Sequence, residues 1–509
     1  MPTFHVIRSR PGLAETRAPA GSWSLRPDAL PDGALQTAFV LGRVDDHGVE
    51  QRVGLVRIAA AGQQRGRTTL PLRFDVVPED VYSLGAGPEY YRELRDLAGA
   101  DAHAVLRALG DVAVDPERRA RFSTDFAFSQ SLVRYGPSRA ALEEAVTILA
   151  SGPADQSGAW TLQFSTAVGG DPVDLDLDFG VGDDLPGEIV VLVGPNGSGK
   201  TRLLANLALS AFDPSEEQAW GRLRTPRSFS RVLAFSYSAL DQFDVPGDGA
   251  RGRSGFLQAG VDSGYSYFGL RDLKAADEAG TSSVPLKSAD RIRRDFEAAM
   301  EEAFDLDTRF REVIEEVLEE PSFRLGVLAG ADDIGDMDDS TLASELREFF
   351  GEASTGHKFV LLMVSQLCAH VRPQCLVLVD EPEAHLHPPL LAAFLRALRR
   401  VLRERGANAV VATHSPFLVQ ETPSRYVRVI TRQGPYTSVR LPVIETFGED
   451  VGTITREVFQ LDTSRSEYVD ILETLASLPI DQVERKFERG LSGQARSLLL
   501  TEQRRRRST

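Results

Sequence analysis

The sequence predicts an α/β fold with a mixed central sheet, and three stretches carry that prediction. Residues 188–209, EIVVLVGPNGSGKTRLLANLAL, place an apolar strand, a glycine-rich turn and an amphipathic helix in succession. Residues 374–380, QCLVLVD, and 408–414, NAVVATH, are short apolar runs that end in polar residues. Such runs are typical of buried parallel strands, whose carboxyl ends meet at one edge of a sheet.

Composition limits the class of protein to which this chain can belong. The chain has 509 residues, 42% of them hydrophobic and 26% charged, which is enough for several globular domains. It contains no apolar run of about 18 residues and no secretory signal at its start. A net charge of −17 argues against a protein coated in nucleic acid, although a local basic surface stays possible. Cys368 and Cys375 are interpreted as core thiols in a reducing cytoplasm.

The N-terminal third shows two patterns. Residues 1–35 are rich in Pro, Ala, Gly and Arg and are predicted to be a loose or strapped-on leader. Apolar residues alternate on both sides of DDHG within residues 37–59, which predicts a β-hairpin, and residues 68–77 offer another strand. Helical periodicity follows over residues 88–149.

The glycine-rich turn is the first stretch that carries chemistry. It is G-x-x-x-x-G-K-T, from Gly194 to Thr201, and its glycines let successive backbone N–H groups surround a phosphate. Lys200 would place its charge on the β- and γ-phosphates of ATP, and Thr201 would offer its hydroxyl to Mg²⁺. The expected ATP-binding residues are Gly194, Asn196, Gly197, Ser198, Gly199, Lys200, Thr201 and Arg202. A chance turn is disfavoured because the strand and the helix flank it correctly.

The second and third runs end in candidate catalytic residues. Asp380 and Glu381 follow the strand Leu376–Val379: Asp380 would hold Mg²⁺ through water, and Glu381 would orient and deprotonate the attacking water. His414 ends the next run, where it could touch a γ-phosphate. The alternatives are an acidic turn after a buried strand and a surface histidine.

The order of these motifs resembles one family. The phosphate loop, then LVLVDEPEAHLHP, then VVATHSP, is similar to the ABC-type ATPase heads of the SMC, RecF and overcoming-lysogenization-defect proteins. The resemblance implies that His414 is the switch at the γ-phosphate. ATPases of the AAA+ and RecA types share the first two motifs but do not have this histidine.

The same resemblance gives a meaning to ASTGHK, residues 353–358. In such heads a signature motif of the type Leu-Ser-(small)-Gly precedes a helix, and that helix is followed by the Walker B strand, which is Leu376–Val379 with Asp380 and Glu381 here. Ser354 and Gly356 match it, whereas His357 and Lys358 replace the more usual residues. The resemblance implies that Ser354, Gly356 and Lys358 act in trans, on the nucleotide of a second protomer. A serine that only caps a core helix is the alternative.

These motifs divide the chain. We expect residues 1–155 to hold the hairpin and a helical region and to complete part of an antiparallel β-lobe. Residues 156–242 would form the first half of the ATPase, 243–350 an inserted helical lobe, and 351–440 the second half. Residues 441–509 would be an extension with a basic tail.

Other candidates are weaker. Gln242 is a candidate Mg²⁺ ligand, with a polar loop residue as the alternative. His385 and His387 suggest a metal pair without a third ligand and fit a subunit-communicating segment better. Three aromatic residues could stack on adenine, although core packing suits each better: Trp160, Phe164 and Phe179.

A basic helix follows the Walker B strand. Arg399 and Arg403 are one helical turn apart, and nucleic acid or an acidic partner is a possible ligand for them. A solvated face is the default. The other arginines of this helix are Arg396, Arg400 and Arg405, and Arg425, Arg428, Arg432 and Arg440 follow it.

Residues 443–461, VIETFGEDVGTITREVFQL, together with DEPEAHLHPPLL and STGHKFVLL, look like the stand-alone ATPases of prokaryotic defence systems. The Septu type, which works with a separate HNH nuclease, is the nearest comparison. The resemblance implies an ATP- and Mg²⁺-dependent ATPase that forms a head-to-head dimer or a larger assembly, controls an effector and needs no membrane. A DNA-repair clamp of the RecF type and a nucleotide sensor with negligible turnover are the alternatives, and DNA or RNA remains a candidate partner.

Overall fold

The computed structural model describes most of the chain. The described ranges are residues 2–7, 18–28, 34–45, 48–134, 136–150, 158–180, 185–212, 220–227, 229–238, 264–272, 284–306, 309–323, 337–434, 436–459 and 467–508. All statements below concern these residues.

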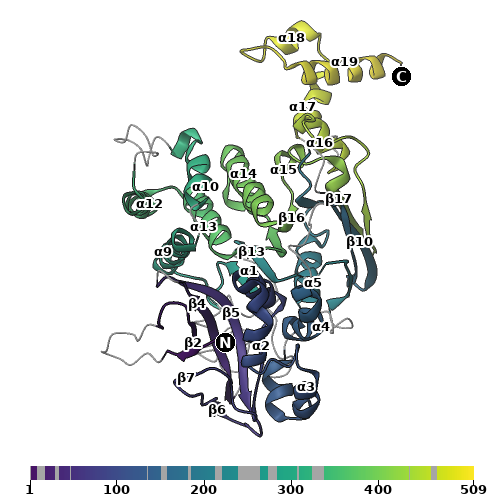
Figure 1. The fold of residues 1–509 in the computed structure, drawn as a ribbon. Helices are drawn as coiled ribbons and strands as arrows, with labels where there is room; N and C mark the ends of the chain where they lie inside the picture. Colours follow the sequence, from purple (N-terminus) through teal and green to yellow (C-terminus); the bar gives the residue numbers. More distant parts are fainter. Residues whose placement is uncertain are drawn as a thin grey trace.

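A seven-stranded sheet forms the centre of the molecule (Figure 1). Its strands run in the order β14-β13-β15-β16-β11-β17-β18, and all neighbours are parallel except β17 and β18. The strand bounds are β11 Ile189–Val193, β13 Arg231–Ser236, β14 Tyr265–Gly269, β15 Cys375–Asp380, β16 Asn408–Thr413, β17 Val427–Gln433 and β18 Tyr436–Arg440. The predicted mixed α/β sheet is therefore confirmed, with β11, β15 and β16 where the apolar runs predicted them.

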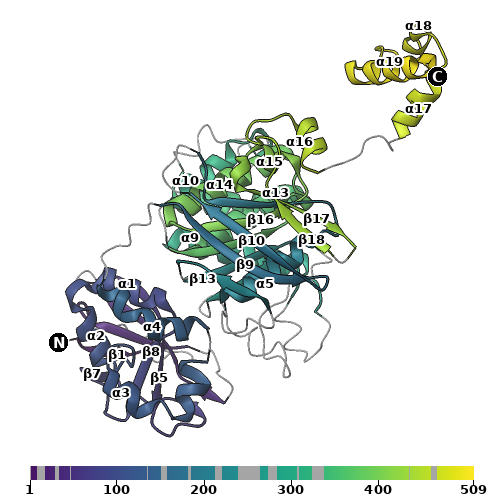
Figure 2. The same cartoon turned by 90° about the vertical axis from the view of Figure 1, so that its right-hand side faces the viewer.

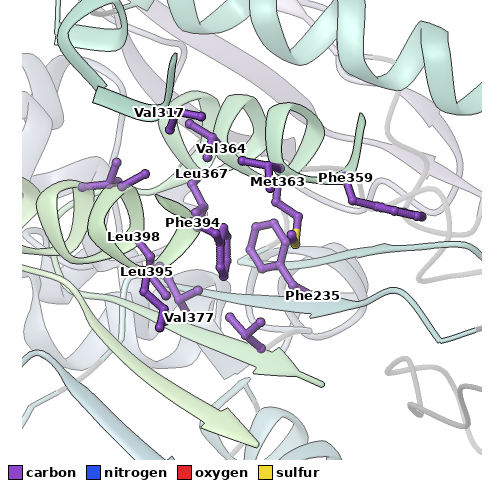
Figure 3. Close-up of a cluster of buried hydrophobic side chains, with 14 of the residues drawn as sticks. Phe235, Val317, Phe359, Met363, Val364, Leu367, Val377, Phe394, Leu395 and Leu398 are labelled. Carbon is purple, nitrogen blue, oxygen red and sulfur yellow. The ribbon is translucent and has the colours of Figure 1, made fainter. Parts of the chain in front are cut away.

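Both faces of this sheet are covered, which explains why its strands are apolar runs without alternation. On one face, α13 (Thr355–His370) and α14 (Pro388–Arg405) pack on side chains such as Phe235 and Val377 (Figure 3). On the other face, α5 (Lys200–Phe212) packs on residues such as Val190 and Leu378. Cys368 and Cys375 lie in the first of these cores and form no disulfide, as expected.

The second core also includes the β-lobe. This antiparallel sheet has the order β10-β9-β12, with β9 Trp160–Val168, β10 Asp171–Phe179 and β12 Arg222–Arg224. Along β9, buried and exposed residues alternate, because its apolar face meets α5 and the central sheet. Trp160 and Phe179 stack on each other at 4.7 Å between ring centroids, and both are buried together with Phe164. These aromatic residues therefore pack in the core.

The N-terminal region is a separate unit, which corrects the prediction that it completes the β-lobe. Its sheet has the order β7-β1-β2-β4-β5-β8, and its core is distinct from the two cores of the ATPase region (Figure 2). The strands are β1 Phe4–Val6, β2 Trp23–Pro27, β4 Ala38–Val44, β5 Glu50–Ala60, β7 Arg73–Phe74 and β8 Val81–Gly85, and β3 Leu35–Gln36 pairs with β6 Gly66–Arg67.

Within this unit the predicted hairpin is confirmed as β4 and β5. Of the two forms predicted for the leader, the loose one is wrong where the segment is described, because Phe4, Trp23 and Leu25 are buried in the sheet. Residues 68–77 contribute only the short β7. The expected helical region is α1 Pro88–Ala98, η1 Gly99–Asp101, α2 Ala102–Ala108, α3 Pro116–Phe122, η2 Phe128–Leu132 and α4 Gly136–Ala150.

The segment between β13 and α13 forms the inserted helical lobe. Its described helices are α9 Ala289–Leu306, α10 Arg309–Leu318 and α12 Asp339–Glu352. The segment also supplies β14, an edge strand of the central sheet that the sequence reasoning missed.

The C-terminal part follows β18. Its first helix, α16 Val451–Glu457, lies against α15 Pro416–Gln420, which together with η6 Ser424–Tyr426 lies between β16 and β17. The helices α17 Glu467–Leu475, α18 Ile480–Glu484 and α19 Gly493–Ser508 share a small core around Leu472 and Leu499. Among the described residues, no helix combines the length and apolar character that a membrane crossing requires.

Candidate nucleotide-binding site

The phosphate loop joins the end of β11 to the first turn of α5. Gly197 and Gly199 have φ values of 79° and 98°, which side chains other than glycine rarely adopt. A Cβ on Gly194 would lie 2.2 Å from the carbonyl oxygen of Ile430 in β17. The sequence of the turn is therefore dictated by backbone geometry and by close packing on the neighbouring strand.

Lys200 begins α5 and folds back over the loop. Its Nζ donates hydrogen bonds to the carbonyl oxygens of Gly194 at 2.9 Å and Pro195 at 3.3 Å. Burial lowers the pKa of this ammonium, and the nearby carboxylates of Glu381, Asp380 and Glu383 act in the opposite direction. A phosphate would give this buried cation a stronger acceptor than two carbonyl oxygens.

Thr201 and Asp380 meet although they are far apart in the sequence. The Thr201 hydroxyl donates to Oδ1 of Asp380 at 3.1 Å, because β11 and β15 both end at this edge of the sheet. A hydroxyl and a carboxylate are the hard oxygen ligands that suit Mg²⁺ when phosphate oxygens complete the set. Ser198 Oγ, in the phosphate loop, is buried and has no hydrogen-bond partner among the described residues, which fits an acceptor supplied by a ligand. The residues present therefore fit Mg²⁺ and a nucleotide phosphate.

Glu381 has a strained backbone. Its φ of 47° and ψ of 57° are left-handed, and among the described residues only Gln374 is another non-glycine residue with positive φ. Its N–H donates to the carbonyl of Ala412 in β16 at 2.8 Å, which holds this conformation. Such strain persists where the surroundings impose it, and it is common at functional sites. Here it turns the carboxylate out of the β15 direction towards His414.

Glu383 is a functional candidate that the sequence reasoning missed. It lies in η5 (Pro382–His385), and its Oε1 accepts hydrogen bonds from the Thr413 hydroxyl and the His414 N–H, both at 2.6 Å. The His414 ring Nδ1 lies 3.1 Å from the same oxygen and 3.7 Å from Oε1 of Glu381. The only sequence signal was an acid two positions after Glu381. Glu383 fixes the ring that was predicted to sense the γ-phosphate.

Five of the predicted residues thus gather at one edge of the sheet: Lys200, Thr201, Asp380, Glu381 and His414. Asn196 lies exposed within the loop, and Arg202 lies exposed in the first turn of α5. Gln242, the predicted Mg²⁺ ligand from the segment after β13, lies outside the described residues.

The signature residues lie elsewhere, at the start of α13. Ser354 is the exposed N-cap, and its Oγ accepts from the N–H of His357. A Cβ on Gly356 would lie 3.0 Å from the carbonyl of His385, so glycine lets α13 approach η5. Lys358 Nζ donates to the Gly351 carbonyl at 3.1 Å. Among the described residues, Ser354 and Lys358 form no hydrogen bond with the phosphate loop of the same chain.

The two histidines of the EAHLHP stretch have structural roles in the described chain. His385 Nε2 lies 2.9 Å from the Tyr237 carbonyl, and its ring stacks on Phe359 at 4.4 Å. His387 is the N-cap position of α14, whose first residue is Pro388. No group of three or more His, Cys, Asp or Glu side chains suited to a metal occurs among the described residues.

The arginine helix is largely occupied by ion pairs. Arg399 is partly buried, with its side chain 14% exposed, and contacts Glu421 through a hydrogen bond to the backbone carbonyl and a 3.4 Å approach to Oε2. Arg403, with its side chain 66% exposed, pairs with Glu188 at 2.9 Å. Arg400 contacts Glu312, Glu316 and Glu404. A nucleic-acid role for Arg399 and Arg403 stays a prediction, and Arg403 is the member of the pair with room to fulfil it.

Comparisons with known proteins agree with this geometry. Residues 331–420 match a family profile described as "AAA domain, putative AbiEii toxin, Type IV TA system". Protein ea59 of Escherichia phage lambda is 29% identical over 479 residues, covering 88% of each chain. The lipoprotein-releasing system ATP-binding protein LolD 2 of Caulobacter vibrioides is 28% identical over 252 residues, 50% of this chain and 84% of the relative.

Solved structures give a weaker comparison. A nucleotide-free ATP-binding cassette from an ABC transporter shares 14% identity with a TM-score of 0.30, over 58% of this chain and 94% of the cassette. The phosphate loop, the paired acids and the profile match are the stronger observations. Together they show that this chain contains a P-loop nucleotide-binding domain of the ABC/AAA ATPase type.

Proposed function

We propose that this protein is an ABC-type ATPase that hydrolyses ATP and closes into a nucleotide-gated head-to-head dimer. The observation that carries the proposal is the convergence of Lys200, Thr201, Asp380 and Glu381 at one edge of the sheet, while the exposed N-terminus of α13 lies apart from them. One half-site is complete within the chain. The other faces outward, where a second chain can meet it.

Each residue has a role that its position supports. The loop N–H groups, Ser198 and Lys200 bind the phosphates, and Thr201 and Asp380 are placed to hold Mg²⁺. Mg²⁺ supplies charge neutralisation of the phosphate oxygens when it is bound. Glu381 accepts a proton from the attacking water, and His414, fixed by Glu383, contacts the γ-phosphate from the side of β16.

The trans assignment rests on helix physics. The first N–H groups of α13 and its dipole favour an anion at Ser354, and α13 is 16 residues long. Ser354, Gly356 and Lys358 would therefore contact the γ-phosphate held by the loop of a second copy. Two nucleotides would be buried between two such heads, and hydrolysis would release them.

We further propose that the closed dimer controls a separate effector, such as an HNH nuclease, in conflict between phages and their hosts. A relative of matching length in a phage and a profile whose description names a toxin support this setting. Cys368 and Cys375 form no disulfide, which supports a reducing compartment such as the cytoplasm. A sensor with negligible turnover is the second candidate, and the unusual His357 in the signature favours it.

The test uses Glu381→Gln, which keeps the size of the side chain but removes the base. This variant should bind ATP and accumulate as a dimer with twice the monomer mass in light scattering, because hydrolysis no longer reopens it. Lys200→Ala is the control that should stay monomeric, since it cannot bind the phosphates. A monomeric Glu381→Gln protein at saturating ATP would refute the head dimer. Measurable phosphate release by the wild type separates the ATPase from the sensor.

A further inference from the structure

His357, the residue that departs from the usual signature, lies at the centre of a hydrogen-bonded chain. Its ring Nδ1 lies 2.7 Å from Ser354 Oγ, and its Nε2 lies 2.8 Å from Ser322 Oγ. The Ser322 hydroxyl in turn donates to Oε2 of Glu320, which also accepts from the Ser322 N–H at 2.9 Å. The chain links the start of α13 to the residues after α10 in the inserted lobe.

The order of donors along this chain is fixed from its buried end. Glu320 is buried, and its carboxylate can only accept hydrogen bonds, so the Ser322 hydroxyl donates to it. Ser322 Oγ must then accept from Nε2–H of His357. The neutral ring is left with a bare Nδ1, which accepts the proton of the Ser354 hydroxyl.

The surroundings hold the ring in place and keep it neutral. The rings of Phe323 and Phe349 lie nearly perpendicular to it, with centroid distances of 4.5 and 5.9 Å. Burial lowers the pKa of His357; Glu320 acts to raise it and His387, at the start of α14, acts to lower it. Lys358, the cation next to it on α13, turns to the Gly351 carbonyl instead.

We infer that His357 is a positioning residue that sets the direction of the Ser354 hydroxyl and couples it to Ser322 and Glu320 of the inserted lobe. The inference rests on the proposed trans role of Ser354. While His357 is neutral, Ser354 directs its proton at the ring and presents lone pairs outward, which repel an anion. Ser354 can donate to a phosphate only when its proton turns away from Nδ1.

Protonation of Nδ1 makes that turn favourable. The ring then donates to Ser354 Oγ, and the hydroxyl proton is free for the phosphate. A γ-phosphate would stabilise the imidazolium, and Glu320 would contribute in the same direction. Closure of two heads should therefore take up one proton at each His357. Movement of the inserted lobe at Ser322 would also change the direction of the Ser354 hydroxyl, because it would alter the hydrogen bond that holds His357.

Two near-isosteric substitutions, each made in the Glu381→Gln background, separate the Ser354 side of the hydrogen-bonded chain from its Ser322 side. The amide of His357→Asn can occupy the position of Nδ1 and keep the contact with Ser354. The longer amide side chain of His357→Gln reaches the position of Nε2, so this variant keeps the hydrogen bond with Ser322 and loses the one with Ser354. The measurement is ATP-driven dimerisation by light scattering between pH 5.5 and 8.

We expect the parent protein to dimerise more tightly at acidic pH, with about a tenfold change per pH unit per titrating site above the His357 pKa. His357→Asn should dimerise with no pH dependence, and His357→Gln about tenfold more weakly than His357→Asn, the effect of one hydrogen bond. The exposed His103 in α2 supplies the matched control His103→Asn, which should leave the profile unchanged. Equal losses in both His357 variants, or pH dependence retained in both, would overturn the inference.

A second readout needs no nucleotide. In the full-length protein labelled with ¹⁵N-histidine, the His357 signals, assigned by their loss in His357→Asn, should show protonated Nε2 and bare Nδ1 at pH 7.5. Ser322→Ala should remove that preference between the two nitrogens. The opposite tautomer would refute the order of donors. If the Glu381→Gln parent itself never dimerises, the proposed function fails, whereas the tautomer result decides the hydrogen-bonded chain independently.

Discussion

Glu383 holds His414 by two separate atoms: its Oε1 accepts the His414 N–H at 2.6 Å and lies 3.1 Å from the ring Nδ1. The carboxylate is nearly buried, with its side chain 8% exposed, so its interactions are weakly screened by water. This contact fixes both the end of β16 and the orientation of the ring, and leaves Nε2 directed away from Glu383.

Glu383→Gln should therefore lower kcat for ATP by 10- to 100-fold, because the ring loses a charged partner that orients it. The affinity for ATP should change less than threefold, since the hydrogen bonds of this carboxylate within the described part of the chain go to Thr413 and His414 and not to the phosphate loop. Phosphate-release kinetics and a fluorescent-ATP titration measure the two effects. Equal losses in affinity and kcat would show that Glu383 supports the loop itself.

Mixed dimers test the trans role of Ser354. Lys200→Ala should abolish ATP binding, whereas Ser354→Arg should bind ATP normally but fail to close, because a bulky side chain replaces the helix cap. Each variant alone should be inactive. A mixture forms dimers with one site built from an intact loop and an intact Ser354, and this site should recover part of the ATPase activity. No recovery, with mixed dimers shown by native mass spectrometry, would mean that Ser354 acts only as a helix cap.

Asp111 predicts a pH-dependent stability of the N-terminal unit. Burial raises its pKa to about 7, although Tyr91 and backbone N–H groups donate to it. A carboxyl with a raised pKa contributes stability that is present below the unfolded value of 3.8 and is lost as the pH rises through about 7. The total is on the order of 4 kcal/mol from the ~3-unit shift.

Hydrogen exchange of peptides from residues 81–113 in the full-length protein measures this effect. Relative to Asp111→Asn, the protection of the wild type should fall by about tenfold per pH unit between pH 5 and 7 and then level off. A constant ratio across this range would contradict a titrating Asp111.

Arg399 and Arg403 should differ sharply when replaced by alanine. Arg399→Ala removes a largely buried guanidinium that donates to the Glu421 carbonyl, and should cost about 1–3 kcal/mol of stability. Arg403→Ala removes an exposed ion pair and should cost under about 0.5 kcal/mol. Thermal unfolding tests both values.

If the helix binds DNA or RNA, Arg403→Ala alone should reduce the salt slope of binding by about one. An unchanged slope would leave Arg403 as the partner of Glu188 only.

The sequence by itself determined the phosphate loop, the Walker B strand and the histidine strand. Each is a local pattern: an apolar run that must be buried, followed by residues that its end presents at one edge of the sheet. Glycine at 197 and 199 follows from the backbone of a single turn. The N-cap role of Ser354 is similarly local, since its partner is three residues away.

Tertiary structure alone decided the rest. Phe4, Trp23 and Leu25 lie in a stretch whose composition looks disordered, yet they are buried because strands distant in sequence cover them. Glu383 reaches His414, and Ser322 reaches His357, across 31 and 35 residues. Such polar contacts leave no periodic trace in a sequence, because hydrogen bonding depends on where strand and helix ends meet in space rather than on spacing along the chain.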